Sequence, residues 1–487
     1  MSNWDLSEIN LRKVYDYCIR RGMQIDNMLG SKDISRLDIL YSSISHEDYK
    51  NLKQILGYLQ EIKAINAKTV YDSEKKKNDE KLVEVESILT NTTAYSTIKK
   101  SIRKLKRCLI SIKDCCVSEV FVNYCQNSNA INKTWSIIKT DSNNYTEKDV
   151  YSLSDGCDYL YGRVIQENIK HEYGIHAGNR DRIIRQLKCV LDDELPKSII
   201  RTDIKSFFES IDTEKLIDEL EEDNRIQKSQ INAIKSIISE YEALSTQSIG
   251  VPRGIGISSY LAEKYLSGVD KKMTNSDYVV YYARFVDDIV IITTENRINS
   301  TENANTVFEL LKHEIESLNL ELHPIGGKSS ICSFDSMDFD FLGYHFIKDG
   351  NKLVVDIADE KMRKIIMKIN RAIISFYNKE YSLKNNLTYR KKLRFLRDRL
   401  ELLSRPVHLL GMTKKTIIGI PVTYSEVTRD KSFVELDNEL KSLTASIKNK
   451  DVQSIIKGIS FSNIDMDNPK NIRYKEYKYL SSIWKRT

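Results

Sequence analysis

The sequence predicts an α+β core flanked by two mainly helical regions. Up to about residue 125, apolar residues recur at helical spacing. From about 155 to 350, short apolar runs alternate with helical segments, and beyond 355 the helical periodicity returns. At 487 residues the chain exceeds the size that one hydrophobic core supports. We therefore expect three parts, at 1–140, 141–350 and 351–487.

Composition and charge describe a soluble protein. Hydrophobic residues make up 41% and charged residues 30% of the chain, and no apolar run is long enough to span a bilayer. The first residues lack the apolar segment of a signal peptide, so we expect a cytoplasmic protein without membrane contact. The net charge of +6 permits nucleic-acid binding without indicating it. None of the 8 cysteines forms a C-x-x-C pair, which predicts free, buried thiols.

Basic residues are concentrated in two places. In the N-terminal region, Ile102, Leu105 and Leu109 recur at a spacing of three to four, which predicts an amphipathic helix. The opposite face of this helix would carry Lys99, Lys100, Arg103, Lys104, Lys106 and Arg107. A second basic stretch covers 361–399 in the C-terminal region. Both are candidates for nucleic-acid contact, and the alternative for each is a solvated helix face.

Two irregular segments interrupt these helical patterns. Residues 126–150 are rich in Asn, Ser, Thr and Lys and predict a linker, which places a boundary near residue 140. In the C-terminal region, Pro406 and Gly411 break the helical periodicity, and 417–424 resembles a short strand.

Two adjacent carboxylates provide the strongest chemical signal. Asp287 and Asp288 lie between two apolar, β-branched runs, which predicts a hairpin with both acids at its tip. Neighbouring acids among apolar strands repel each other and lose hydration, so a divalent metal ion would compensate them. The alternative is an ordinary Asp-Asp turn, because Asp is a favoured turn residue.

A third carboxylate follows another apolar run. Asp203 ends the run 198–202 and precedes an aromatic pair. Three carboxylates from two strands suit two Mg²⁺ ions at roughly 3.5–4 Å from each other. Asp212 precedes Thr213 and Glu214, so we interpret it as a helix N-cap and not as a metal ligand.

A glycine-rich loop lies between the two acidic motifs. Residues 250–256 (GVPRGIG) precede a helical pattern. Glycine permits close approach of the backbone to a ligand, and a helix N-terminus favours anions. Alone this loop is equally typical of an ordinary turn, but its position between the acidic motifs strengthens the functional interpretation.

The order D-x-x-x-F-F, G-x-P-x-G-x-x-x-S and F-V-D-D resembles motifs A, B and C of the reverse-transcriptase family across about 160–350. Lys328 occupies the place of the motif D lysine, and Phe341-Leu342-Gly343-Tyr344 resembles the motif E primer grip. Arg253 and Val286 stand where relatives often carry Gln and Ala or Met. The resemblance implies a right-hand polymerase with a palm, fingers, and mainly helical flanking regions.

The resemblance also implies a set of site residues. Catalysis would involve Asp203, Asp287, Asp288 and Lys328, and metal binding would involve Asp203, Ile204, Asp287 and Asp288. The nucleotide would contact Arg180, Arg182, Lys205, Phe207, Phe208, Arg253 and Gly254. Phe208 stands at the steric-gate position, which favours DNA synthesis over RNA synthesis. Primer and template would contact Phe341, Leu342, Gly343 and Tyr344.

Cofactors and partners follow from the same resemblance. We expect two Mg²⁺ ions, for which Mn²⁺ can substitute, with deoxynucleotides, an RNA template or associated non-coding RNA, and a DNA product. The flanking helical regions together with Arg253 in motif B most resemble bacterial defence-associated, abortive-infection reverse transcriptases, several of which make DNA with an associated non-coding RNA or a protein primer. Synthesis here is therefore expected to be RNA-directed or template-independent, and a homo-oligomer or a partner subunit is compatible with this. Candidate priming tyrosines are Tyr377, Tyr381, Tyr389, Tyr424, Tyr474, Tyr477 and Tyr479. The alternative function is a catalytically silent palm-fold scaffold that binds RNA or a partner subunit.

Overall fold

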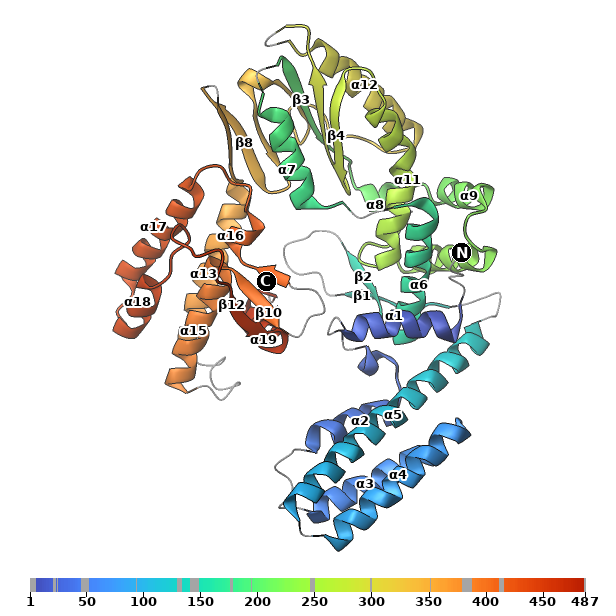
Figure 1. Cartoon of the computed structure of the whole chain (residues 1–487). Coiled ribbons are helices and arrows are strands. Elements are labelled where there is room, and N and C mark those ends of the chain that lie inside the picture. Colours follow the sequence, from blue (N-terminus) through green and yellow to red (C-terminus); the bar gives the residue numbers. More distant parts are fainter. Residues whose placement is uncertain are drawn as a thin grey trace.

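The computed structural model describes residues 6–20, 23, 25–44, 52–92, 94–128, 134–140, 149–175, 178–193, 195–245, 250–297, 300–350, 352–378, 388–410 and 416–485. Figure 1 shows N-terminal helices (blue), a central region of helices and a sheet (green to yellow), and a C-terminal region (orange to red). Helices and antiparallel sheets are mixed in the central region, so the fold is α+β, as predicted.

Long helices form the N-terminal region. They are α1 (Glu8–Arg20), the short 3-10 helix η1 (Asp26–Met28), α2 (Lys32–Ser43), α3 (Leu52–Asn66), α4 (Asp72–Asn91) and α5 (Tyr95–Ser128). Helix α5 packs against α1, α2, α3 and α4. Ile102, Leu105 and Leu109 are at most 1% exposed, which confirms the predicted amphipathic helix. The apolar face of α5 therefore holds this bundle together.

A small two-stranded sheet occupies part of the predicted linker. Strand β1 (Ile137–Thr140) pairs antiparallel with β2 (Val150–Leu153). Just before β1, Trp135 is buried, and its ring stacks on Tyr161 with centroids 5.6 Å apart. The backbone N–H of Trp135 donates to Glu240 at 2.7 Å. The linker prediction is thus wrong for 134–140, while 129–133 and 141–148 lie outside the described residues.

The central sheet has the strand order β4-β5-β3-β6, and each strand is antiparallel to its neighbours. Its strands are β3 (Lys197–Asp203), β4 (Val279–Phe285), β5 (Asp288–Thr294) and β6 (Ser330–Ser333). The predicted hairpin is confirmed, because β4 and β5 pair directly on either side of Val286 and Asp287. Strand β3 lies beside β5 and ends at the same edge as the hairpin tip.

Helices and a second sheet cover both faces of the central sheet. The helices of this region are α6 (Gly156–Tyr173), α7 (Arg180–Leu191), α8 (Phe207–Ser210), α9 (Thr213–Asp223), α10 (Lys228–Leu244), α11 (Gly256–Thr274) and α12 (Glu302–Ser317). Ile200 and Ile289 lie in the core that includes α11 and α12. Ile199 and Val290 lie in the core that includes α7. This alternation explains why adjacent positions, Ile199 with Ile200 and Ile289 with Val290, are both apolar.

Helix α9 begins as the sequence predicts. The Asp212 side chain accepts a hydrogen bond from the backbone N–H of Lys215 at 3.0 Å, which confirms its interpretation as an N-cap.

A three-stranded antiparallel sheet follows, with the order β7-β8-β9. It consists of β7 (Asp338–Phe341), β8 (Tyr344–Asp349) and β9 (Lys352–Ile357), after the 3-10 helix η3 (Phe334–Ser336). Leu342 and Gly343 form the β7–β8 turn with φ values of 48° and 83°. Two positive φ values in a two-residue loop are typical of a type I′ turn.

The C-terminal region combines helices with a small sheet. Its helices are α13 (Asp359–Tyr377), α15 (Tyr389–Ser404), α16 (Ile420–Thr423), α17 (Lys431–Ser446), α18 (Lys450–Lys457) and α19 (Tyr474–Lys485). Strand β10 (Val407–Leu410) pairs antiparallel with β11 (Thr416–Ile418) and parallel with β12 (Lys470–Arg473). The buried Arg399 ties these elements together, since it donates to the Leu480 carbonyl at 3.2 Å and to Ser375 at 2.8 Å.

Two further expectations change in detail. The strand-like segment 417–424 is a strand only to Ile418, because Gly419 has a φ of 131° and Pro421 favours the first turn of α16. None of the 8 cysteines forms a disulfide, and four of them are buried as predicted, but Cys115, Cys125 and Cys332 are only partly buried and Cys189 is exposed.

Among the described helices, none combines the length and apolar character that crossing a bilayer requires.

Candidate active site

Three carboxylates meet at one edge of the central sheet. Asp203 and Asp288 are direct partners across β3 and β5, and Asp287 immediately precedes Asp288 at the hairpin tip. The backbone N–H of Ile204 donates to the Asp287 carbonyl at 3.2 Å, which joins the end of β3 to the tip. Asp203 is 5% exposed, and the other two acids are half-buried. The sheet register therefore brings together the three acids that the sequence singled out.

Burial and mutual repulsion shift the titration of two of these acids. Burial, followed by the charge of Asp203, raises the pKa of Asp287 above its ordinary value. Burial, then the charges of Asp287 and Asp203, raises the pKa of Asp288 to about 6. Positive charge at this edge would relieve the repulsion between the carboxylates.

Three basic side chains surround the carboxylates. Lys328 donates from Nζ to Asp203 Oδ2 at 2.6 Å, although its side chain is 60% exposed. His323 Nε2 lies 3.7 Å from the same oxygen, and its backbone N–H donates to the Asp203 carbonyl at 2.9 Å. Arg201 Nη2 lies 3.9 Å from Asp288 Oδ1. The predicted motif D lysine is thus in contact with a predicted metal ligand.

The hairpin tip is strained and is held by a buried arginine. Val286 has a φ of 62°, a conformation that is unfavourable for a β-branched residue. Arg284 is 4% exposed and donates from Nη1 to the Val286 carbonyl at 2.8 Å. Its remaining donors reach Asp270 at 2.7 and 2.9 Å and Glu263 at 2.7 Å, both on α11. Tyr282 also donates to Asp270, at 2.7 Å. Helix α11 therefore fixes the turn that presents Asp287.

The glycine-rich loop packs closely against two other segments. The N–H of Val251 donates to the Phe208 carbonyl at 2.8 Å, and a Cβ on Gly250 would lie 2.0 Å from that carbonyl oxygen. A Cβ on Gly254, where φ is 99°, would lie 2.5 Å from the Tyr151 carbonyl oxygen. At both positions a larger residue would clash with a backbone carbonyl of the protein itself, which accounts for the two glycines without a ligand. The expected approach of Gly254 to a ligand therefore remains a prediction.

Arg253 and Phe208 form one unit beside the carboxylates. The Arg253 guanidinium lies 4.9 Å from the centroid of the Phe208 ring and pairs with Glu209 at 3.1 Å. Phe208 is 7% exposed, so only a small part of its ring can face a substrate. The charge of Arg253 also lowers the pKa of Asp287, although burial outweighs it.

Three other predicted site residues have limited access to a ligand. Phe207 is 0% exposed and lies in the hydrophobic core, so its expected nucleotide contact does not agree with the structure. Ile204 is 1% exposed and has no ligand atom in its side chain, so only its backbone carbonyl could bind a metal ion. Lys205 pairs with Glu321, which is itself 69% exposed. An exposed ion pair of this kind is weak and can open.

Arg180 is engaged away from the carboxylates. It donates to the carbonyls of Leu342 and Thr423, each at 2.8 Å, and its guanidinium lies 4.7 Å from the Tyr344 ring and 5.1 Å from the Tyr424 ring. In this arrangement Arg180 joins α7 to the β7–β8 turn and α16, and its expected nucleotide contact would require it to leave these partners. The Arg182 side chain is exposed on the first turn of α7.

The predicted primer-grip residues divide into buried and accessible ones. Phe341 and Tyr344 are at most 1% exposed, and the Tyr344 hydroxyl donates to the Thr423 carbonyl at 3.0 Å. Leu342 and Gly343 are partly exposed at the turn between them. Of the four predicted primer-grip residues, Leu342 and Gly343 are therefore the two that a nucleic acid could contact.

The carboxylate oxygens of Asp203, Asp287 and Asp288 are ligands that Mg²⁺ prefers, but they do not fill its coordination sphere without further ligands. Among the described residues, no group of three or more His, Cys, Asp or Glu side chains is arranged to hold a metal ion unaided. Mg²⁺ commonly binds through one or two carboxylates together with substrate phosphates and waters. Asp203, Asp287 and Asp288 with a nucleotide triphosphate would form such a set.

Sequence reasoning missed the residues that position the acids. Arg284 lies inside an otherwise apolar strand, which is a detectable signal because an isolated charge there requires a partner, whereas Arg201 lies in a strand with several other polar residues. The partners of Arg284 on α11 lie 14 and 21 positions away. His323 carries no such signal in the sequence.

Comparison with protein families gives one match. Residues 143–346 match the family described as "Reverse transcriptase (RNA-dependent DNA polymerase)", and this segment includes all three carboxylates and Lys328. The comparison with curated proteins gives no significant match.

Solved structures give distant matches. A structure of apo telomerase from Candida tropicalis is 13% identical, with 99% of this chain and 92% of that chain covered and a TM-score of 0.35. Telomerase from Candida albicans, in complex with a fragment of telomeric RNA, is 11% identical, with 77% and 73% covered and a TM-score of 0.34.

We predict that Arg284→Met weakens Mg²⁺ binding, because the Val286 carbonyl and hence Asp287 lose their support. Supporting partners of metal ligands typically contribute roughly 10- to 100-fold in affinity. Calorimetric titration with Mg²⁺, in the presence of a deoxynucleoside triphosphate, measures the change.

Lys264→Met is the matched control for this substitution. Lys264 lies on α11, the helix that carries the partners of Arg284; its side chain is 11% exposed and pairs with two acids, Glu219 and Asp223, each at 3.2 Å. It should lower stability without changing Mg²⁺ affinity. Equal Mg²⁺ affinities for Arg284→Met and the wild type would show that Arg284 does not position the carboxylates.

Proposed function

We propose that this chain is an RNA-dependent DNA polymerase, and hence a nucleotidyltransferase, that adds deoxynucleotides at Asp203, Asp287 and Asp288. The match of residues 143–346 to the reverse-transcriptase family supports this proposal. The observation that carries this proposal is the convergence of three buried or half-buried carboxylates from β3 and the β4–β5 hairpin. In this proposal the central sheet is the polymerase palm, and α7 belongs to the fingers.

The carboxylates would hold two Mg²⁺ ions, for which Mn²⁺ can substitute. When bound, such ions activate the primer hydroxyl and neutralise the triphosphate. Asp203 and Asp288 face each other across two paired strands, so the backbone fixes their separation. Asp287 is fixed by the strained turn that Arg284 supports. Burial and then the charges of the neighbouring carboxylates raise the pKa values of Asp287 and Asp288, and a cationic ligand would offset both effects.

Lys328 would serve the leaving group. Its ammonium now neutralises Asp203, but the side chain is 60% exposed and is therefore able to move toward a bound triphosphate. There it would neutralise the developing charge of the pyrophosphate or donate a proton to it.

Phe208 would select deoxynucleotides. It is five positions from Asp203, and the Arg253 guanidinium lies over its ring, paired with Glu209. A ring fixed in this way offers no hydroxyl to a ribose and little freedom to move aside. This arrangement supports DNA as the product.

The primer would lie along the β7–β8 turn. Leu342 and Gly343 are partly exposed there. The Lys361 side chain, at the start of α13, lies against Gly343: a Cβ added to this glycine would be 3.2 Å from it. Lysine beside an exposed turn is suited to contact with a phosphate backbone.

Several sources of template and primer are compatible with this site: an RNA template, an associated non-coding RNA, synthesis without a template, or a protein primer. Of the candidate priming tyrosines, Tyr377 and Tyr389 are each 49% exposed, whereas Tyr424 is 8% exposed and packed under Arg180. Tyr381 lies outside the described residues. Burial makes Tyr424 a poor acceptor. The silent-scaffold alternative is not favoured, because the family that matches is a polymerase family.

The wild-type chain should incorporate labelled deoxynucleotides with Mg²⁺ or Mn²⁺, and Asp287→Ala with Asp288→Ala should abolish incorporation, because both metal positions lose a ligand. Ribonuclease and protease treatment of the product would distinguish an RNA primer from a protein primer. Wild-type protein that stays inactive with its native RNA and partners present would reject the polymerase proposal.

We predict that Phe208→Ala raises the incorporation of ribonucleotides relative to deoxynucleotides by roughly tenfold or more, since a missing contact surface in a pocket changes selectivity by about that much. Single-nucleotide extension with each substrate gives the ratio. Phe207→Leu is the control, because this neighbouring ring lies in the core and should not affect selectivity. An unchanged ratio in Phe208→Ala would remove the steric-gate role.

A role in bacterial antiphage defence is the biological part of the proposal. It rests on the helical extensions on both sides of the polymerase region, which resemble those of defence-associated enzymes. Cells that carry the wild-type chain should reduce phage plating efficiency, and cells that carry the Asp287→Ala, Asp288→Ala variant should not. Equal plating on both would contradict a defence role that depends on polymerisation.

A further inference from the structure

The exposed face of α5 carries an uncompensated row of positive charge. From Tyr95 to Lys113 this helix contains no acidic residue. Lys100, Arg103 and Arg107 are exposed, and none of the three forms an ion pair with another described residue. Lys104, by contrast, is neutralised by Glu84 on α4.

The spacing of this row is regular. Residues three and four apart share one face of a helix, so Lys100, Arg103 and Arg107 form a continuous row. They rise roughly 4.5 Å and then roughly 6 Å along the helix axis. Such a row suits successive phosphates of one extended strand. A single compact anion could contact two neighbouring side chains of this row but would not span its length of roughly 10 Å.

Exposed aromatic rings accompany the row. Tyr41 on α2 is 40% exposed and Tyr95 at the start of α5 is 50% exposed. Lys106 lies 4.7 Å from the Tyr41 ring, and Lys99 lies 5.7 Å from the Tyr95 ring. Basic side chains interleaved with aromatic rings are typical of surfaces that bind single-stranded nucleic acid, because the bases stack on the rings.

The row leads into a pocket. A cavity of 440 Å³ begins at Arg107 and continues along α5 past Ile110, Ser111 and Asp114 to Tyr71 at the N-terminus of α4. Ile110 is 49% exposed at its entrance. The lining also includes Glu74 and the paired Arg12 and Asp114. An apolar side chain, a tyrosine ring, hydroxyl groups and carboxylates that can accept hydrogen bonds from an exocyclic amine are suited to an unpaired base.

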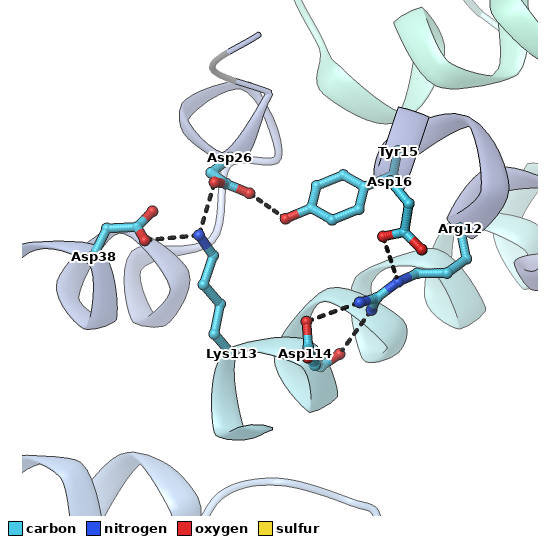
Figure 2. Close-up of polar contacts among 7 residues, drawn as sticks. All are labelled: Arg12, Tyr15, Asp16, Asp26, Asp38, Lys113 and Asp114. Atoms are coloured by element: carbon cyan, nitrogen blue, oxygen red, sulfur yellow. Dashed lines mark hydrogen bonds and ion pairs between the residues drawn. The ribbon is translucent and has the colours of Figure 1, made fainter. Parts of the chain in front are cut away.

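Figure 2 shows the polar contacts that join α5 to α1, η1 and α2, and two of the residues drawn, Arg12 and Asp114, also line the pocket. Arg12 of α1 donates to Asp114 of α5 at 2.8 Å and to Asp16 at 3.1 Å. Lys113, the residue before Asp114 on α5, donates to Asp26 of η1 and to Asp38 of α2, each at 2.7 Å.

This network also links α5 to the polymerase region. Tyr15 on α1 donates to Asp26 at 2.5 Å, and α1 packs against α6 as well as against α5. The position of α5 relative to the polymerase region is therefore fixed through α1 and does not depend on one connecting segment.

We infer that this α5 surface, defined by Lys100, Arg103, Arg107 and the adjoining pocket, binds single-stranded RNA at a site separate from the active site. The phosphates lie along the basic row, and one unpaired base enters the pocket. The inference rests on the proposed RNA-directed synthesis for the nature of the strand. The site would hold RNA on the enzyme while another part of that RNA is copied.

The test compares two triple variants that remove the same charge. Lys100→Gln, Arg103→Gln, Arg107→Gln should weaken binding of a labelled, unstructured RNA by roughly tenfold or more, and should reduce the salt dependence of log K by about 2, because three phosphate contacts are lost. Lys53→Gln, Lys68→Gln, Lys76→Gln is the control, since these exposed lysines lie elsewhere on the same bundle. Fluorescence anisotropy at several salt concentrations measures both quantities. Equal effects of the two triple variants would overturn the inference.

Two further readouts separate this site from the active site and from a protein partner. Extension of a saturating, pre-annealed short primer–template should be the same for the α5 variant and the wild type, so loss of polymerase activity cannot mimic the result. RNA containing 4-thiouridine should cross-link to the segment 107–118 or near Tyr71. Absence of these cross-links, or an equal loss of binding to an acidic polyglutamate peptide, would reject RNA as the ligand.

Discussion

Mutual repulsion among Asp203, Asp287 and Asp288 is the constraint on which the rest of the site depends. The two paired strands bring these acids together, and burial makes their charge costly, as the raised pKa values of Asp287 and Asp288 show. Two cationic side chains act on these carboxylates in different ways. Lys328 contacts Asp203 directly, while the buried Arg284 holds the strained backbone at Val286 that presents Asp287. A cation bound between these carboxylates would relieve this repulsion.

The same sheet edge organises the surrounding elements. Helix α11 supplies the acids that hold Arg284, and the loop before it carries Arg253 against Phe208. Arg180 links α7 to the β7–β8 turn and to α16 in the C-terminal region. Its guanidinium therefore connects the helix that carries the predicted nucleotide contacts to the turn that carries the predicted primer contacts. On the other side, α1 connects the N-terminal bundle to α6. The proposed RNA surface on α5 would thus have a fixed position relative to the proposed active site.

Local pattern was sufficient to predict the elements that carry the acids. Apolar, β-branched runs predict the β4–β5 hairpin and the strand before Asp203, and apolar residues at helical spacing predict the amphipathic α5. Strand β1 was missed because its four residues lie in a polar stretch and are stabilised by pairing with β2 and by the nearby burial of Trp135. The partners of Arg180 and Arg284 were beyond prediction for a similar reason, since they depend on contacts between distant segments. Phe207 was assigned to the nucleotide from its neighbour, whereas the helical turn of α8 places its ring in the core.

The central claim is that Asp203, Asp287 and Asp288 hold two catalytic metal ions once a nucleotide is present. Crystals of the chain with primer–template, an incoming deoxynucleotide and Mn²⁺ would test it directly through anomalous scattering. Our account predicts two Mn²⁺ peaks at these carboxylates, roughly 3.5–4 Å from each other, with Lys328 displaced from Asp203 toward the phosphates. A bound nucleotide whose metal ions contact none of the three carboxylates would contradict it.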